Sequence, residues 1–328
     1  MADQRNQVNI PANLVPKVWA KKVWHEGVKD SYFDKFTAMD GSNVVHQNKD
    51  LTNVKGDSVV FGLMMNLTGS GVEGNRQKLS GAEDTLNIYD FTVQTQLVRN
   101  AVSRFEADDQ KTQYDMLKEI KGALKQWLAD WLDNKLMSEL CSTPSSSKEA
   151  VAASAAGTYS SITANDKLTT TIISRAKRKA MMHAPKVQPI KVDGMDKYIM
   201  LVSPWAARDL KDDPKWLAAQ QNANVRGSKN PIFTGALGEY DGVILYEYER
   251  VLCDNTGASS ANVCHNLLLG KQAACFAVAR PAKHIEQTDD YGNIAGNGIA
   301  FYGEVKKTKF NNKDYGSIQV LTGGVVEQ

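Results

Sequence analysis

The sequence lacks the features that would direct a chain into or across a membrane. Its longest apolar stretch, 59–67, is interrupted by Gly62 and Asn66, whereas a membrane-spanning helix needs about 20 apolar residues. The first thirteen residues are polar and contain no apolar core of a secretory signal. We therefore expect a protein that starts in a cytoplasm and has no membrane partner.

Cysteine is scarce as well. The four cysteines are Cys141, Cys253, Cys264 and Cys275. Their wide spacing, without any CxxC pair, argues against a disulfide scaffold and against a zinc ribbon, so we expect free and mostly buried thiols. Cys264 precedes His265, but a metal site or a Cys–His nucleophile would need partners that the sequence does not place. A buried structural thiol is the favoured interpretation.

Neither sign of charge dominates. The 328 residues include 39 Lys plus Arg and 37 Asp plus Glu, a formal net charge of +2, which lacks the electrostatic footprint of a dedicated nucleic-acid-binding protein. Only 24 glycines and 9 prolines occur, which excludes collagen-like and low-complexity chains. With 42% hydrophobic residues, the chain can bury a sizeable core in one large or two ordinary domains.

The N-terminal third predicts an extended ribbon. The first fifty residues mix aromatic and charged side chains without a sustained period, which fits either an arm lying on other surfaces or an irregular first layer of the domain. Next, 58–67 and 86–97 are rich in β-forming residues and are separated by a glycine-rich stretch. Two strands with a long flexible tip follow from this pattern. An isolated ribbon is marginal in water, so it must pack on its own domain or on a neighbouring subunit.

The strongest helical pattern covers 106–140. Leucine, isoleucine and tryptophan recur there at intervals of three and four, for example at Leu124 and Trp127, and no proline interrupts them. A helix of this length would run roughly 50 Å and could form the spine of a domain. The Ser- and Ala-rich stretch 141–166 that follows is our preferred internal boundary.

The remaining chain predicts helices and strands in irregular alternation. Helices are expected at 167–183 and 205–222. Short strands are expected at 198–202, 243–248, 266–269 and 274–279, and a final hairpin at 299–309 with 315–321. This order favours an α+β fold over a doubly wound parallel sheet.

One glycine motif suggests an enzyme. Gly69 to Gly74 matches the GxGxxG dinucleotide fingerprint, and Asp90 stands about where a ribose-binding acid would be. A pyrophosphate needs the N-terminus of a helix directly after the glycines, whereas 75–87 contains Gly81 and only a thin apolar pattern. A flexible loop tip explains the motif better, and an NAD-dependent oxidoreductase is the alternative. No other catalytic arrangement stands out, so we expect no enzyme, cofactor or metal site.

Basic residues gather between Asp166 and Asp193, where the chain has no acidic residue. Such a patch could face nucleic-acid phosphates without reading sequence, as in a non-specific nucleic-acid-binding module. A solvated helix face is the plainer alternative. The candidate DNA-facing side chains are Arg175, Lys177, Arg178, Lys179 and Lys186.

A specific resemblance rests on the stretch 203–243. It reads SPWAARDL at 203–210, WLAAQ at 216–220 and RGSKNPIFTGALGEYDGV at 226–243. These motifs, with KKTKF at 306–310, resemble the major capsid proteins of tailed bacteriophages, in the group typified by coliphage N-four. The motif residues expected to matter for assembly are Arg226, Gly227, Asn230, Pro231, Phe233, Gly235, Gly238 and Gly242.

The resemblance implies a Hong Kong 97-type capsid fold, in which the chain divides into four parts. These are an N-terminal arm (1–53), an extended E-loop (54–99), a peripheral domain with a spine helix (100–166 and 281–328) and an axial domain (167–280). The resemblance further implies a subunit that assembles in the bacterial cytoplasm into hexamers and pentamers of an icosahedral virion shell around double-stranded DNA. Scaffolding and portal proteins, and in some relatives decoration or cement proteins, are the implied partners.

Overall fold

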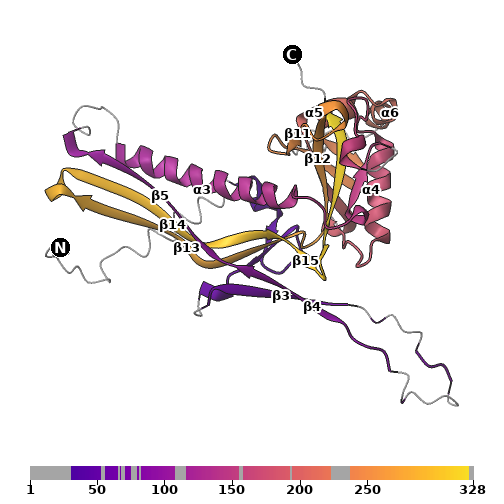
Figure 1. Ribbon diagram of the computed structural model, residues 1–328, viewed down its shortest axis with the longest axis horizontal. Coiled ribbons are helices and arrows are strands. Elements are labelled where there is room, and N and C mark those ends of the chain that lie inside the picture. The colour runs from indigo at the N-terminus through magenta and orange to yellow at the C-terminus, as the bar shows by residue number, and fades with distance from the viewer. Residues whose placement is uncertain are drawn as a thin grey trace.

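The computed structural model describes residues 31–52, 56–65, 67, 71–74, 80, 83–107, 116–154, 158–192, 194–222 and 237–324. Within them, a long sheet flanked by one helix joins a second sheet that carries three shorter helices, and a two-stranded hairpin projects from the junction (Figure 1). This mixture confirms the predicted α+β class.

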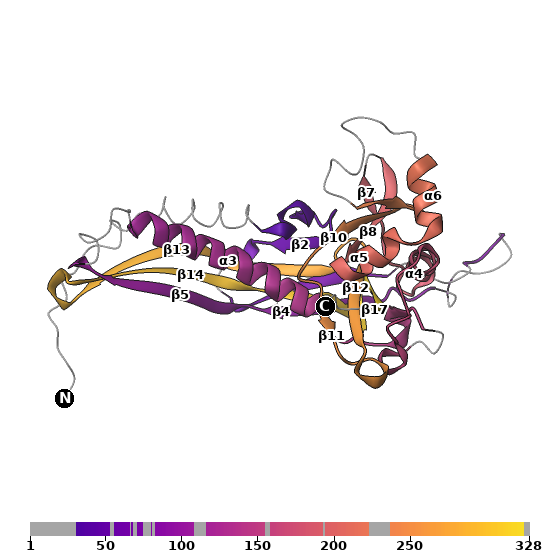
Figure 2. The ribbon, with the colours of Figure 1, turned by 90° about the horizontal axis from the view of Figure 1, so that it is seen from above.

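The elongated half of the molecule is a five-stranded sheet. In spatial order its strands are β1 (Thr37–Ala38), β2 (Val45–Asn48), β13 (Ala274–Asp289), β14 (Ile294–Lys307) and β5 (Gln96–Phe105). β13 and β14 form one long antiparallel hairpin, and β5 pairs with β14 up to Phe105. Helix α3 (Met116–Leu140) lies along one face of this sheet (Figures 1 and 2).

Helix α3 buries a stripe of side chains spaced four residues apart. The stripe consists of Ile120, Leu124, Leu128, Leu132, Leu136 and Leu140. Because an α-helix has 3.6 residues per turn, each step of four rotates the stripe by about 40°. The helix therefore presents different sides along its length, and one core cluster contains both Phe301 of the long sheet and Leu267 of the second sheet. The spine-like helix predicted over 106–140 is present at 116–140; residues 108–115 lie outside the described part.

The second sheet has eight strands. Its main path is β6 (Ala150–Ala152), β17 (Ser317–Gly324), β12 (Asn262–Leu269), β8 (Met195–Val202), β10 (Val243–Glu247) and β9 (Gly238–Tyr240), with β11 (Cys253–Asp254) beside β12 and β7 (Ile190–Val192) beside β8. Helices α4 (Thr170–Met182), α5 (Pro204–Lys211) and α6 (Pro214–Asn222) accompany it.

Strand β8 is buried on both of its faces. Tyr198, Met200 and Val202 pack in the core with α4 and α5, whereas Ile199 and Leu201 belong to the core that includes α3. A strand covered on both sides needs apolar residues at every position, which explains why 198–202 is a continuous apolar run rather than an alternating one.

The single helix predicted over 205–222 is wrong. The structure has two helices there, α5 and α6, which are separated at Asp212 and Asp213. Pro214 opens the second helix, because proline has no N–H to donate and is accommodated in a first helical turn but not in a helix interior.

The predicted C-terminal hairpin of 299–309 with 315–321 is also wrong. β14 pairs with β13 and β5, whereas β17 pairs with β12 and β6. The local turn exists, but it joins only β15 (Lys309–Phe310) to β16 (Lys313–Asp314). The chain passes from one sheet to the other at this point, which local alternation does not reveal.

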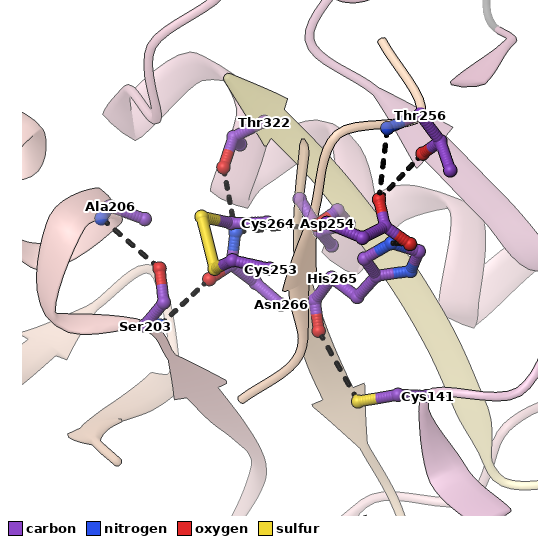
Figure 3. The surroundings of a disulfide bond; sticks show 11 residues. Cys141, Ser203, Ala206, Cys253, Asp254, Thr256, Cys264, His265, Asn266 and Thr322 are labelled. Atoms are coloured by element: carbon purple, nitrogen blue, oxygen red, sulfur yellow. Dashed lines mark hydrogen bonds and ion pairs between the residues drawn. A yellow bond between two sulfur atoms is a disulfide. The ribbon is translucent and has the colours of Figure 1, made fainter. Parts of the chain in front are cut away.

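The expectation of four free thiols holds for two of them. Cys141 and Cys275 are free and buried, but Cys253 and Cys264 form a disulfide (Figure 3). Antiparallel pairing of β11 with β12 places the two cysteines directly opposite each other, with their Cα atoms 4.2 Å apart. The two cysteines are 11 residues apart in the sequence, and strand pairing brings them together. A search for CxxC motifs does not detect such a pair.

The thiol state is directly measurable. We expect denatured, unreduced protein to take up alkylating reagent at two cysteines, and reduced protein at four, by intact-mass spectrometry. In the native state both free thiols should react slowly, because burial raises the pKa of Cys141 to about 11 and that of Cys275 to about 12, and the thiolate is the reactive form. Four alkylated cysteines without reductant would contradict the disulfide.

One carboxylate caps two helices. Asp213 Oδ2 accepts hydrogen bonds from the Thr170 N–H and hydroxyl at 2.8 and 2.9 Å, and its Oδ1 accepts one from the Lys215 N–H at 3.0 Å. Partial burial would raise the pKa of Asp213, but the hydrogen bonds from Thr170 and Lys215 outweigh it and hold the pKa below its usual value. α4 and α6 are thereby fastened at one point.

We expect Asp213→Asn to lower the free energy of unfolding by about 1 kcal/mol at neutral pH, the usual cost of losing a helix cap. A lowered folded-state pKa means that the carboxylate stabilises the fold above its unfolded-state pKa and loses this effect as the pH falls through its folded-state value. The difference between wild type and variant should therefore vanish in acid. Urea unfolding across pH measures it, with the exposed neighbour Asp212→Asn as control; a pH-independent difference would contradict the ionic cap.

Candidate assembly surfaces and basic patch

The β3–β4 hairpin covers its own domain with one face only. β3 (Ser58–Met64) pairs antiparallel with β4 (Ile88–Gln94), which confirms the predicted ribbon. Val59, Phe61 and Val93 are buried against Cys275 and Ala277 of β13. The hairpin is thereby anchored at its base (Figure 1).

The opposite side of the hairpin is uncovered, and it carries exposed apolar side chains beside the polar residues Asp90 and Thr92. We call the exposed apolar residues of the two strands and of the chain just beyond them the hairpin face: Val60, Met64, Leu67, Leu86 and Ile88, which are 46 to 64% exposed. Met64 and Ile88 are direct cross-strand partners, so their side chains form one continuous patch. Contiguous exposed apolar patches of this kind mark interaction surfaces.

The long sheet offers a second uncovered feature at its edge. β5 is the last strand of the five-stranded sheet, and its Leu97, Val102 and Phe105 are exposed. An edge strand presents backbone N–H and C=O groups that another strand can pair with. The edge is therefore a candidate for contact with another chain.

The resemblance motif is described only in part. Arg226, Gly227, Asn230, Pro231, Phe233 and Gly235 lie outside the described residues. Gly238 begins β9, and Asp241 and Gly242 form the two-residue turn between β9 and β10 with φ of 50° and 71°. Positive φ at both positions is the signature of the tight hairpin turn that Asp-Gly favours.

The start of the same motif caps a helix. Ser203 accepts a hydrogen bond from the Ala206 N–H at 3.2 Å, and Pro204 occupies the first helical position of α5. Asn266 supports this corner: its Oδ1 accepts from the Ser203 N–H at 2.9 Å and its amide donates to Thr322 Oγ1 at 2.8 Å (Figure 3). The motif thus joins β8, α5, β12 and β17.

Three of the five candidate DNA-facing residues are engaged within the fold. Lys177 pairs with Asp241 at 2.8 Å and holds the turn between β9 and β10, and its hydrogen bond lowers the pKa of Asp241. Arg175 donates to the carbonyl of Ala152, and Lys179 to those of Ala150 and Ser147.

These contacts protect a sheet edge. Among the described strands, β6 pairs with β17 alone, and the Ala153 N–H donates to the carbonyl of Leu321 across that pair. Because backbone groups alternate in direction along a strand, the carbonyls of Ala150 and Ala152 point away from β17, where Arg175 and Lys179 bind them. Burial, with a smaller contribution from Arg175, lowers the pKa of Lys179.

Arg178 and Lys186 differ from the other three. Both are exposed, and neither makes a side-chain hydrogen bond or ion pair within the described ranges. The structure therefore separates the predicted patch into basic residues that hold strands and turns and basic residues that face solvent.

The glycine motif belongs to the hairpin and not to a cofactor site. Gly71 and Gly74 have φ of 66° and 82° with no atom near their Cβ positions, and Gly69 lies outside the described residues. The strand before them pairs antiparallel with β4 instead of entering a helix, and no helix occurs among the described residues from 71 to 94. The oxidoreductase alternative is not supported.

The Cys264-His265 pair is structural. Cys264 is in the disulfide, and the buried His265 ring lies 3.2 Å from Asp254 (Figure 3). The same ring contacts Gln319 at 2.9 Å. Burial lowers the pKa of His265, although Asp254 opposes the shift. No cluster of three His, Cys, Asp or Glu that could hold a metal occurs among the residues described.

Comparison with known proteins assigns the chain. A family model described as phage capsid protein matches residues 12–326. The chain belongs to the phage capsid protein family. This capsid protein is 25% identical to the major capsid protein of Pseudomonas phage KPP25, over 92% of its own length and 93% of the relative's.

Solved capsid structures agree. The capsid of Ralstonia phage GP4 matches with a TM-score of 0.81 at 26% identity, covering 92% of this chain and 93% of that one. The capsid asymmetric unit of cyanophage Pam1 matches with a TM-score of 0.81 at 22% identity, covering 92% and 94%. The capsid protein therefore has the Hong Kong 97-type fold, and it is a phage major capsid protein and part of the virion. Among the described helices, none has the length and apolarity needed to cross a bilayer.

The role of Asn266 in this capsid protein is testable. We expect Asn266→Ala to reduce the free energy of unfolding by about 3 kcal/mol, because it leaves the buried Ser203 N–H without an acceptor and Thr322 without its donor. The exposed Asn255→Ala is the matched control and should change the stability little. Chemical denaturation of the two variants compares them, and equal stabilities would show that Asn266 does not hold the motif together.

Proposed function

We propose that this capsid protein self-assembles as hexamers and pentamers into an icosahedral shell that encloses double-stranded DNA. The observation that supports the proposal most strongly is the hairpin face. The side that the chain's own domain leaves bare carries Val60, Met64 and Ile88, each more than 60% exposed. A subunit that functioned alone would gain nothing from that exposure.

Docking on a neighbour would bury this face. A closed shell uses the same subunit in heterologous contacts that close around symmetry axes. A hairpin anchored at its base by Val59, Phe61 and Val93 and bare along its outer side suits such a contact. The affinity of each single contact can be low, because a closed shell forms many contacts at once and thereby raises the effective concentration of neighbouring surfaces. The exposed edge of β5 adds a place for backbone pairing between chains.

The chain divides, in this proposal, into an N-terminal arm (1–53), an E-loop (54–99), a peripheral domain (100–166 and 281–328) and an axial domain (167–280). Two strands from the peripheral ranges, β6 and β17, pair within the sheet formed by the axial range. We therefore place these two strands with the axial domain, and we place the whole of β13, which begins at Ala274 inside the axial range, with α3 and β14 in the peripheral body.

Further parts of the proposal rest on the family resemblance. The chain would belong to the group typified by coliphage N-four, have no catalytic activity and assemble in the bacterial cytoplasm. A scaffolding protein, a portal protein and decoration or cement proteins are its proposed partners. The motif residues proposed to act in assembly are Arg226, Gly227, Asn230, Pro231, Phe233, Gly235, Gly238 and Gly242.

Contact with packaged DNA is proposed to be local and non-specific. A net charge of +2 provides no general attraction, so positive side chains must act where they gather. Arg178 and Lys186 are exposed, whereas Arg175, Lys177 and Lys179 also hold neighbouring strands and turns. We propose that phosphate contacts involve the first two directly.

The assembly role is tested at the centre of the hairpin face. We expect Ile88→Asp to abolish or strongly reduce shell formation, because docking would bury an unpaired charge, while the subunit stays folded, since Ile88 is 63% exposed. Light scattering and negative-stain images measure the particles, and circular dichroism checks the fold. Asn255→Asp, an exposed site with the same charge change, is the control and should still form shells. Normal shells from the Ile88 variant would contradict the proposal.

A further inference from the structure

A cavity of about 490 Å³ lies beside the C-terminal half of α4. Three of its basic side chains come from that helix at the spacing that places residues on one side, and a fourth comes from β16. The charged and titratable residues that line it are Glu149, Arg175, Arg178, Lys179, His183 and Lys313.

Positive charge in this cavity is not balanced. Of the described residues that line it, Glu149 is the one carboxylate, against four Lys and Arg side chains. Its Oε2 accepts a hydrogen bond from the Ser146 N–H at 2.9 Å, and its Oε1 lies 4.0 Å from His183 Nε2. Arg175 and Lys179 are held by backbone carbonyls, which orient their charges without neutralising them.

The remaining two cations have no such restraint. Arg178 and Lys313 are exposed at the cavity and make no ion pair among the described residues. Like charges gathered in a partly enclosed site repel one another, so an anion of more than one charge would stabilise the arrangement. Two of the four donors are already positioned, which lowers the ordering cost of binding.

We propose that this cavity binds a phosphate group, with Arg175, Arg178, Lys179 and Lys313 as its cationic contacts. Arginine guanidinium groups suit phosphate because they donate parallel hydrogen bonds to two of its oxygens. A single carboxylate supplies one negative charge, whereas phosphate supplies up to two and more acceptor oxygens. The phosphate belongs either to a free polyphosphate or to the DNA backbone.

The site would join two parts of the fold. Lys313 belongs to the β15–β16 ribbon that connects the two sheets, and the three helical residues belong to α4. A second, mainly apolar cavity of about 200 Å³ shares Ala184 and Lys313 with it and is lined by Leu63 and Tyr89 of the hairpin. The phosphate site and the hairpin therefore have a common wall.

Binding is measured by isothermal titration of the full-length chain, as subunit and as assembled shell, with inorganic tripolyphosphate and with a short DNA duplex at constant ionic strength. We expect tripolyphosphate to bind, and Arg178→Gln and Lys313→Gln each to weaken it about tenfold, since each removes a charge-assisted hydrogen bond. Lys191→Gln, which removes an exposed charge outside the cavity, is the control and should leave the affinity for tripolyphosphate unchanged. Lys186→Gln is titrated with the DNA duplex to test the surface contact separately. Melting temperatures without ligand should stay close to that of the wild type, because neither Arg178 nor Lys313 makes an ion pair or a side-chain hydrogen bond among the described residues.

The outcomes distinguish the phosphate site from the DNA contact proposed above. Of the two phosphate sources named for this site, only the DNA backbone rests on that proposed contact. Tripolyphosphate binding without DNA binding would support the phosphate site and contradict the proposed DNA contact. DNA binding that depends on Lys186 but not on Lys313, with no tripolyphosphate binding, would overturn the site and retain a surface contact. Equal affinities in all variants would overturn the proposal, because they would show that Arg178 and Lys313 do not form a phosphate-binding site. Tighter binding of an oligoglutamate peptide than of tripolyphosphate would replace the phosphate with an acidic protein segment.

Discussion

Everything in this capsid protein depends on strands that are buried on both faces. In β8, Ile199 and Leu201 point into the core shared with α3, while Met200 and Val202 point into the core beneath α4 and α5. The two cores are therefore separated by one layer of backbone, and neither sheet can shift without disturbing the other. Apolar burial on both sides of a strand is what makes two sheets of different shape act as one body.

The same arrangement recurs in β13 and gives the hairpin its orientation. Phe276 and Val278 belong to the core with α3, whereas Cys275 and Ala277 pack under Val59 and Phe61 of β3. Alternate residues of one strand thus hold the spine helix on one side and the hairpin on the other. The hairpin is held at its base by these contacts, and its outer side, which carries Val60, Met64 and Ile88, stays uncovered. The shape of the subunit follows from side-chain alternation in two strands.

Local patterns in the sequence predicted what depends on local chemistry. The β3–β4 ribbon, the long helix and the α+β class follow from periodicity. The break between α5 and α6 was predictable in principle, because Pro214 stands inside the pattern. The pairing partners of β14 and β17 were not predictable from the sequence. The alternation of apolar residues in these strands is compatible with their pairing to each other or to strands in two separate sheets. The Cys253–Cys264 disulfide depends in the same way on which strands become neighbours.

The basic patch shows why a cluster of charges in sequence does not identify a binding surface. Residues 175 to 179 lie on one helix, yet Lys177 faces the Asp241 turn while Arg175 and Lys179 face the edge of β6. An unprotected edge strand is a site for unwanted pairing, and in a protein that packs many copies side by side such an edge would compete with the intended contacts. Cationic side chains bound to the outward carbonyls of Ala150 and Ala152 occupy that edge. Much of the local positive charge therefore serves the fold, and among the five candidate DNA-facing residues only Arg178 and Lys186 are held by no carbonyl or carboxylate of the described chain.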